Sequence, residues 1–482
     1  MVNLHAPRAA PSLRQSLDDL ASRRISAREL ALVTLQRADD TQRRLNAFAC
    51  IPREHALAAA AESDRRYAEG TQRPLEGLPI GVKDLIDTQG IETRYGSPAF
   101  IGNVPSADAA VVRTLVEQGA IVVGKTTTHE FAWGVTTASA AFGDTLHPLD
   151  ARRIPGGSSG GAAVAIADGV MAAGLGTDTG GSVRIPAALC GVTGFKPSYG
   201  VVPTQGIFPL AASLDHPGLL GASVSDVSVL AEALRIVGGS DAADELGDAR
   251  IGVICSIASL PPAADIACAF AVAADALASA FSLEALNAGD LFGGSFDAFA
   301  RIVLAEGGLV HFARRDPDWI AANYGAETVE RLTRAMATRV EDYASAQQAR
   351  RKFAAGLERL MARHRFIVLP TTPCTAPRVG ETRLAIGNWS GTVREALMTY
   401  TAPFNLAGCP AISIPLRRSV GALPVGLQVV GRPGDDAALL QIARRMERLL
   451  HPNDSPRSSA RPPRQTDREL STCPTRREGE MQ

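Results

Sequence analysis

Two glycine-flanked serines constrain this chain more than any other feature. Ser158 lies in the stretch GGSSGG at residues 156–161, and Ser182 follows 24 residues later at the end of GTDTGGS, residues 176–182. Glycines beside a hydroxyl let the backbone turn tightly and aim several N–H groups at one point, which a serine nucleophile needs when an oxyanion forms. Glycine-rich turns also bind phosphate or simply reverse the chain, so these two stretches alone leave the chemistry open.

A lone lysine interrupts an apolar run upstream of both serines. Lys83 lies within LPIGVKDLID, residues 78–87, a pattern typical of a buried strand. Burial lowers the pKa of an ammonium group, so Lys83 can be neutral near physiological pH and accept a proton from a hydroxyl. The alternative is a lysine that reaches the surface and pairs with Asp84 or Asp87. The two serine loops favour the base.

The order and spacing of these residues resemble the amidase signature hydrolases. The likeness extends from about residue 13 to about residue 450 and includes TTP at 371–373, NLAGCPA at 405–411 and LPVGLQ at 423–428. By this resemblance Lys83 is the base, Ser158 is the bridging serine on a cis peptide, and Ser182 is the nucleophile. The resemblance also implies the amidase signature fold.

Helical and strand patterns alternate along the chain. Helices are predicted at residues 26–45 (with a capping-type start at Ser26), 56–67, 108–118, 162–173, 185–190, 226–236 and 350–364. Strands are predicted at the Lys83 run and at residues 120–125, 173–176, 251–254 and 366–369. This alternation favours an α/β fold, a single large amidase domain over residues 1–450 with a mixed central β-sheet covered by helices. Residues 451–482 are rich in Arg, Pro, Ser and Glu and predict a disordered C-terminal tail.

The loop around Ser182 supplies a candidate oxyanion hole. Its expected donors are the backbone N–H groups of Thr179, Gly180, Gly181 and Ser182. Asp178 and Arg184 flank the nucleophile with opposite charge, and an ion pair that rigidifies the loop is favoured over contact with substrate. Ser159 either supports the bridging serine or satisfies its own turn.

The acyl pocket is expected between the strand at 120–125 and the first serine loop. Phe131, Trp133 and Thr137 are its candidate lining residues. Aromatic residues in loops serve packing as often as recognition, so the sequence indicates a pocket without identifying a substrate.

A Ser-Ser-Lys relay explains how such a chain can hydrolyse an amide without a histidine. Neutral Lys83 would take a proton from Ser158, Ser158 would take one from Ser182, and Ser182 would attack the carbonyl to give an acyl-enzyme. None of the eight histidines lies in the glycine loops, so a Ser-His-Asp triad is not indicated. Because no HExxH motif, cysteine cluster or carboxylate-rich motif is present, we expect neither a metal nor a cofactor.

Composition limits the partners and the compartment. A formal net charge of −1 gives no footprint for direct nucleic-acid binding, so the expected partner is a small-molecule amide. Seven cysteines without a C-x-x-C pair favour free thiols and a cytoplasmic location. No signal-peptide pattern or membrane span is indicated. A homodimer is left open.

Three rival functions remain. The first is the glutaminase subunit of a tRNA-dependent amidotransferase, which typically has a Gly-Ser-Ser stretch followed by an acid, where this chain has GVTTA at 134–138, and an acidic residue for the amino group of glutamine, where this chain has Met398. Without that acid the ammonium of glutamine loses its partner, which favours a free-standing amidase. The second rival is a hydrolase of ureido or carboxybiuret-type amides. The third is a catalytically silent ligand-binding module, which the presence of Lys83, Ser158 and Ser182 disfavours.

Overall fold

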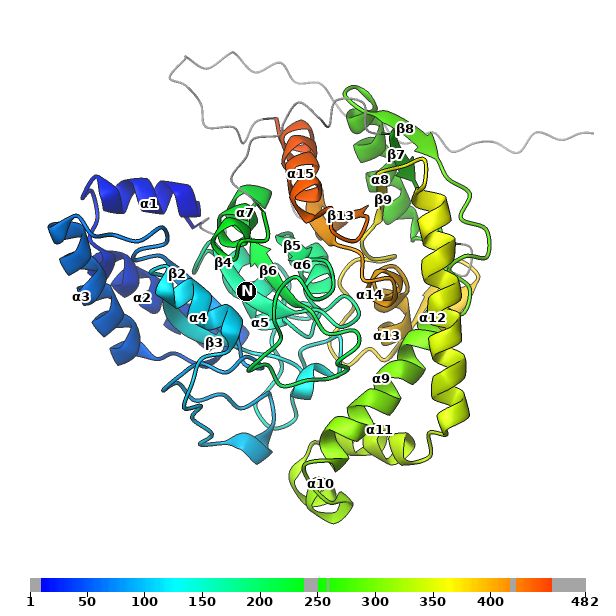
Figure 1. The fold of residues 1–482 in the computed structure, drawn as a ribbon, viewed down its shortest axis with the longest axis horizontal. Helices are drawn as coiled ribbons and strands as arrows, with labels where there is room; N and C mark the ends of the chain where they lie inside the picture. The colour runs from blue at the N-terminus through cyan, green and yellow to red at the C-terminus, as the bar shows by residue number, and fades with distance from the viewer. Residues whose placement is uncertain (1–9, 238–249, 258–259, 417–421, 453–482) are drawn as a thin grey trace, which may run out of the picture.

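The computed structural model describes residues 10–237, 250–257, 260–416 and 422–452 (Figure 1). From residue 453 onward, the tail predicted at 451–482 lies outside these residues. No helix in the described ranges is long and apolar enough to cross a membrane.

Eleven strands of the described chain form one mixed sheet in the order β1-β3-β2-β4-β6-β5-β12-β13-β9-β7-β8. Their bounds are β1 Phe48–Cys50, β2 Pro79–Lys83, β3 Ile121–Thr126, β4 Ala173–Thr177, β5 Thr193–Lys196, β6 Pro217–Gly221, β7 Arg250–Val253, β8 Ser282–Ala285, β9 Phe366–Pro370, β12 Ala411–Leu416 and β13 Val425–Gly431. The pairs β2/β3, β2/β4, β7/β8 and β7/β9 are parallel, and the others are antiparallel. A small hairpin, β10 Arg383–Ile386 with β11 Trp389–Thr392, stands apart from this sheet.

The helices cover the sheet and extend beyond it. They are α1 Leu13–Ala21, α2 Ala27–Leu45, α3 Arg53–Glu69, α4 Ala110–Glu117, α5 Gly160–Ala167, α6 Arg184–Cys190, α7 Val224–Ala233, α8 Ala264–Ala278, α9 Ser295–Phe312, α10 Pro317–Asn323, α11 Ala326–Met336, α12 Val340–Met361, α13 Val393–Thr399, α14 Ala402–Leu406 and α15 Asp436–Leu450, with short 3-10 turns at Pro98–Phe100 and Glu130–Ala132.

Alternate residues of each strand face two different cores. Ile80 and Val82 of β2 join the core that contains the buried faces of α4, α7, α8 and α15. Ile121 and Val123 of β3 join the core that contains α2, α3, α5 and α6. Because side chains alternate across a strand, Lys83 lies on the face opposite Val82, which is the face that α5 covers.

The parallel arrangement of β2 and β4 brings the candidate site together. Gly81 is in register with Gly174 and Val82 with Leu175, so both strands run in the same direction. Their carboxyl ends therefore meet at one edge of the sheet, which places Lys83 next to the end of β4 at Thr177. The second serine loop leaves the sheet at that point.

Most of the predicted elements are confirmed, with changed boundaries. The strand around Lys83 ends at that residue, because the chain turns there and the Ile86 N–H donates to the Lys83 carbonyl over 3.0 Å. The helix expected to end at residue 173 ends at Ala167, since Gly169 adopts a positive φ of 75° that reverses the chain toward β4. The helix expected at 350–364 begins ten residues earlier, at Val340.

The sequence patterns do not predict the helical region between residues 295 and 336. Figure 1 shows α9 to α12 together at the opposite end of the view from α1, α2 and α3. Helix α9 packs against α11, α12, α13 and α14, and Phe299 and Ile302 of α9 are buried. This region covers the site from a side that the sequence motifs do not mention.

The capping box of α2 gives a stability prediction. The Ser26 hydroxyl accepts from the Glu29 N–H over 3.1 Å, and the Glu29 carboxylate accepts from the Ser26 N–H over 2.9 Å. We expect Ser26→Ala to lower the free energy of unfolding by about 1 kcal/mol, measured by urea denaturation, because an N–H of the first turn loses its acceptor. Ser26→Thr keeps the acceptor and should retain most of the stability; equal losses in both variants would contradict this account.

Candidate active site

Lys83 is a fully buried lysine held by two hydroxyl groups. Its Nζ lies 2.7 Å from Ser158 Oγ and 2.7 Å from Thr177 Oγ1, and the residue is 0% exposed. Neither Asp84 nor Asp87 forms an ion pair with it. Asp84 instead accepts from the N–H groups of Arg94 and Gly96, so the surface pair that the sequence left open is not formed.

Burial decides the charge state of Lys83. Loss of solvent lowers the pKa of its ammonium group to about 7, although the carboxylates of Asp178 and Asp215 act in the opposite direction. At neutral pH a substantial share of the molecules therefore carries an uncharged amine in contact with Ser158. A neutral amine in contact with a hydroxyl can accept its proton.

Ser158 lies in a loop that Thr137 holds in place. The Gly157–Ser158 peptide is cis, and α5 begins two residues later at Gly160. The Thr137 hydroxyl donates to the Gly156 carbonyl over 2.8 Å and accepts from the Gly160 N–H over 3.1 Å. A Cβ on Gly157 or Gly160 would come within 2.6 Å and 2.3 Å of Thr137 Oγ1, so the close approach requires glycine.

Ser159 joins the two serine loops through the backbone. Its hydroxyl donates to the Thr177 carbonyl over 3.2 Å and accepts from the Thr177 N–H over 3.3 Å, while its own N–H donates to the Ser182 carbonyl over 3.1 Å. Of the two roles that the sequence left open, these bonds are neither to the bridging hydroxyl nor within its own turn. They fix the loop of Ser158 against the loop of Ser182.

The loop of Ser182 presents free N–H groups beside the serine. The amides of Thr179, Gly180 and Ser182 have no acceptor among the described residues, and the Ser182 hydroxyl likewise has none. The Gly181 N–H differs from the expected set, because it donates to Asp178 Oδ1 over 2.7 Å. Gly181 also has a φ of 126°, and a Cβ there would come within 2.1 Å of Thr401 Oγ1. Gly181 therefore shapes the loop, and its amide is already engaged.

A buried ion pair supports this loop. Asp178 and Arg184 are fully buried, and their side chains meet through two hydrogen bonds of 2.9 Å and 3.0 Å. Arg184 also donates to the Thr401 carbonyl and to the side-chain oxygens of Asn405 and Gln428. Burial alone would raise the pKa of Asp178, but Arg184 and Asn405 outweigh it and hold that pKa below the ordinary range. The pair thus contacts the protein on all sides, as expected for a supporting role.

Sequence reasoning missed three members of this network. Asn405 and Gln428 lie in motif stretches to which the sequence assigns no role, and the signal for them is a single amide side chain inside an apolar run. The third is Asp215, a buried carboxylate that accepts from Thr179 Oγ1 over 2.6 Å and from the N–H groups of Leu210 and Ala211. Burial raises the pKa of Asp215 to about 6. Asp215 orients Thr179 and hence one of the free amides.

A pocket opens at Ser182, and one of its three expected lining residues is present there. Trp133 lines it together with residues from three helices, and its wall also contains Gly134, Val135, Leu210, Phe299, Val303, Arg394 and Met398. Phe131 is fully buried in a cluster with Phe208, Tyr324 and His311, and is not a wall residue. Thr137 holds the Ser158 loop as described above. Tertiary packing, which a local motif does not encode, decides these two positions.

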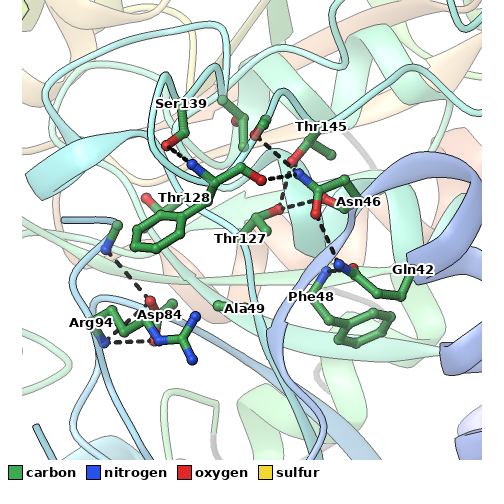
Figure 2. Close-up of a pocket in the computed structure, with 14 residues that line it drawn as sticks. Gln42, Asn46, Phe48, Ala49, Asp84, Arg94, Thr127, Thr128, Ser139 and Thr145 are labelled. Carbon is green, nitrogen blue, oxygen red and sulfur yellow. Dashed lines mark hydrogen bonds between the residues drawn. The ribbon is translucent and has the colours of Figure 1, made fainter. Parts of the chain in front are cut away.

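A second cavity, of about 150 Å³, lies on the other side of Thr137 (Figure 2). It is polar: Asp84, Arg94, Asn46 and Thr127 line it, and Figure 2 shows the Asn46 side chain among hydrogen-bonding neighbours. Burial raises the pKa of Asp84 to about 6. This cavity shares no lining residue with the pocket at Ser182.

The described residues contain no group of three or more His, Cys, Asp or Glu side chains that could hold a metal ion. Metal independence remains a prediction for experiment. The chemistry that the site offers comes from hydroxyls, one amine and backbone N–H groups.

Comparison with known proteins identifies the family. A family model described as Amidase matches residues 29–440. The chain is 36% identical over 480 residues to the A subunit of the Glutamyl-tRNA(Gln) amidotransferase of Aromatoleum aromaticum, covering 90% of this chain and 96% of that protein. Its structure is similar to a crystal structure of an amidase, with a TM-score of 0.84, 33% identity and coverage of 91% and 100% of the two chains. It is also similar to the peptide amidase of Stenotrophomonas maltophilia, with a TM-score of 0.78, 27% identity and coverage of 92% and 98%.

The matched range contains Lys83, both serine loops and the Asp178–Arg184 network, and the eleven-stranded mixed sheet is that of the similar structures. The chain therefore belongs to the amidase signature family of hydrolases, which act on C–N bonds.

Proposed function

We propose that this protein is a free-standing amidase that hydrolyses a carboxylic amide to an acid and ammonia or an amine through an acyl-enzyme on Ser182. Lys83 is the base, Ser158 carries the proton, and the free amides of Thr179, Gly180 and Ser182 bind the oxyanion. Asp178, Arg184 and Ser159 are positioning residues. No metal or cofactor takes part.

One observation carries this proposal: a buried amine touches a hydroxyl and has no carboxylate partner among the described residues. The 2.7 Å contact between Lys83 Nζ and Ser158 Oγ lies at the same sheet edge as the Ser182 loop. An ordinary structural lysine would be paired or solvated. A lysine with a pKa of about 7 in contact with a serine is suited to remove a proton at neutral pH.

The reaction then balances in two steps. Lys83 takes the Ser158 proton as Ser158 takes the Ser182 proton, the Ser182 Oγ forms a bond to the carbonyl carbon, and the C–N bond breaks as the relay returns a proton to the leaving nitrogen. Water attacks the resulting ester by the same relay, and the carboxylic acid leaves with Ser182 restored.

The glutaminase subunit of a tRNA-dependent amidotransferase is the second candidate, because relatives that are 35% and 36% identical carry that name. Met398 argues against it. Its thioether lines the pocket at Ser182, where an α-ammonium group would find an apolar side chain instead of a carboxylate. Ammonia release from glutamine that exceeds release from every simple amide and ureido acid would favour the glutaminase.

Three further expectations remain proposals. Residues 1–450 form one amidase domain, an organisation supported by a sheet whose strands come from residues 48 to 431. A cytoplasmic location is supported by the free thiols of the six described cysteines. A homodimer remains open, and sedimentation would test it.

The first prediction concerns the nucleophile. Ser182→Ala should lower kcat/KM by roughly 10⁴-fold or more, because covalent catalysis has no substitute nucleophile here, and Ser158→Ala should be less complete. A fluorophosphonate probe should label wild type at Ser182 and leave Ser182→Ala unlabelled. Labelling at Ser158 or at a cysteine would contradict the assignment, and a protein that neither labels nor turns over any amide would be a silent binding module.

The second prediction concerns pH. Because Lys83 must be neutral to accept a proton and its pKa is lowered to about 7, kcat/KM should rise with pH through about 7 and then level off. Lys83→Met keeps most of the apolar packing and removes the base, so activity should collapse while circular dichroism stays native. A variant that keeps both the rate and the basic limb would show that Lys83 is structural.

The third prediction concerns metals. Prolonged treatment with a strong chelator should leave kcat/KM unchanged, since the relay already supplies the base and backbone amides supply the electrophile. Loss of activity that zinc or manganese restores would overturn the metal-free mechanism.

A further inference from the structure

One arginine in the wall of the Ser182 pocket has no partner among the described residues. Arg394, the second residue of α13, lines the pocket together with Ser182. It forms no hydrogen bond and no ion pair with any described residue, and the Phe296 ring lies 6.0 Å from its guanidinium carbon. Burial, together with Arg331 and Arg334, lowers the pKa of Arg394 to about 10, so it stays charged at neutral pH.

The neighbouring charges do not neutralise Arg394. Arg331 and Arg334 of α11 are both close enough to act on it, and Arg331 Nη1 is buried without a hydrogen-bond partner. The carboxylate that opposes them is Glu327, which is already bound by His129 over 3.0 Å and by Arg331. Burial would disfavour ionisation of Glu327, but His129 and Arg331 outweigh it and lower its pKa to about 2.

The remainder of the pocket wall is largely apolar. Trp133, Val135, Phe299 and Met398 surround the space next to Ser182, and Met398 Cε and Phe299 Cζ would each lie 2.4 Å from a Cβ on Gly180. A buried guanidinium among apolar side chains is costly unless an anion pairs with it. Carboxylates fit this requirement best, because the planar guanidinium can donate two parallel hydrogen bonds to them.

We infer that the acyl group of the substrate ends in a carboxylate that Arg394 binds, so that the substrate is a mono-amide of a short dicarboxylic acid. This inference rests on the amide hydrolysis proposed above and adds its specificity. The amide carbonyl lies at Ser182, an apolar chain lies against Trp133 and Met398, and the distal carboxylate meets Arg394. An ammonium on the same chain would face a cation and a thioether.

Matched pairs of substrates test the inference. Malonamate, succinamate and glutaramate each have a neutral counterpart of equal length, namely propanamide, butanamide and pentanamide. The best carboxylate should exceed its neutral counterpart in kcat/KM on the order of 10- to 100-fold, the usual strength of a charge-assisted hydrogen bond. Glutamine, which adds an ammonium to glutaramate, should be poorer than glutaramate.

Arg394→Met assigns the effect to one side chain. It should reduce the preference for the carboxylate over the neutral amide to a ratio of about 1, mainly through KM. The dicarboxylate product should inhibit wild type competitively and should lose that inhibition in Arg394→Met. Arg351→Met, which removes an exposed arginine of α12 without a described partner, is the control and should keep the wild-type ratio.

Two results would overturn the inference. One is hydrolysis of neutral amides by wild type at the same kcat/KM as the carboxylates. The other is an Arg394→Met protein that keeps the full preference while circular dichroism shows a native fold. In both cases labelling of Ser182 and turnover of amides would leave the proposed amidase intact. If no amide is hydrolysed and Ser182 is not labelled, both proposals fail.

Discussion

The burial of one ammonium group controls the rest of the site. Lys83 lies at the end of a central strand, on the face that α5 covers, and its only polar contacts within the described ranges are the hydroxyls of Ser158 and Thr177. In water a lysine would remain charged far above neutral pH. Here desolvation brings the pKa to about 7, while Asp178 and Asp215 offset part of that effect. The sheet thus sets the chemistry, because the parallel pairing of β2 and β4 fixes where the amine meets the serine loops.

The nucleophile loop depends on a different kind of burial. Asp178 and Arg184 are both removed from solvent, and such a pair is tolerated only when the remaining donors and acceptors are matched. Asn405 and Gln428, which come from the C-terminal half of the chain, complete that matching. The loop that follows β4 is therefore held by residues more than 200 positions away. This explains why a glycine-rich and otherwise adaptable loop can present its amides in one arrangement.

The sequence predicts the chemistry well where a local pattern determines it. Glycines around two serines and a lysine in an apolar strand are sufficient to name Lys83, Ser158 and Ser182, and a capping box is sufficient to place α2. The pocket is harder, because its walls come from α9 and α13, and no local pattern ties Phe299 or Arg394 to Ser182. The prediction for Phe131 is wrong for the same reason: an aromatic residue in a loop looks the same whether it faces a substrate or a core. Asp215 and the engagement of the Gly181 amide likewise emerge only when distant segments are packed together.

The protonation state of Lys83 can be measured directly, because the chain contains only four lysines, Lys83, Lys125, Lys196 and Lys352. Lysine labelled with ¹³C and ¹⁵N would give a small set of side-chain signals, and Lys83→Met and Lys196→Met would assign the two whose pKa burial lowers to about 7. The account predicts that the Lys83 signal titrates with a midpoint near 7 in the Ser182→Ala protein. A Lys83 signal that stays protonated up to about pH 10, the ordinary range of a solvated lysine, would contradict the claim that this buried amine is the base.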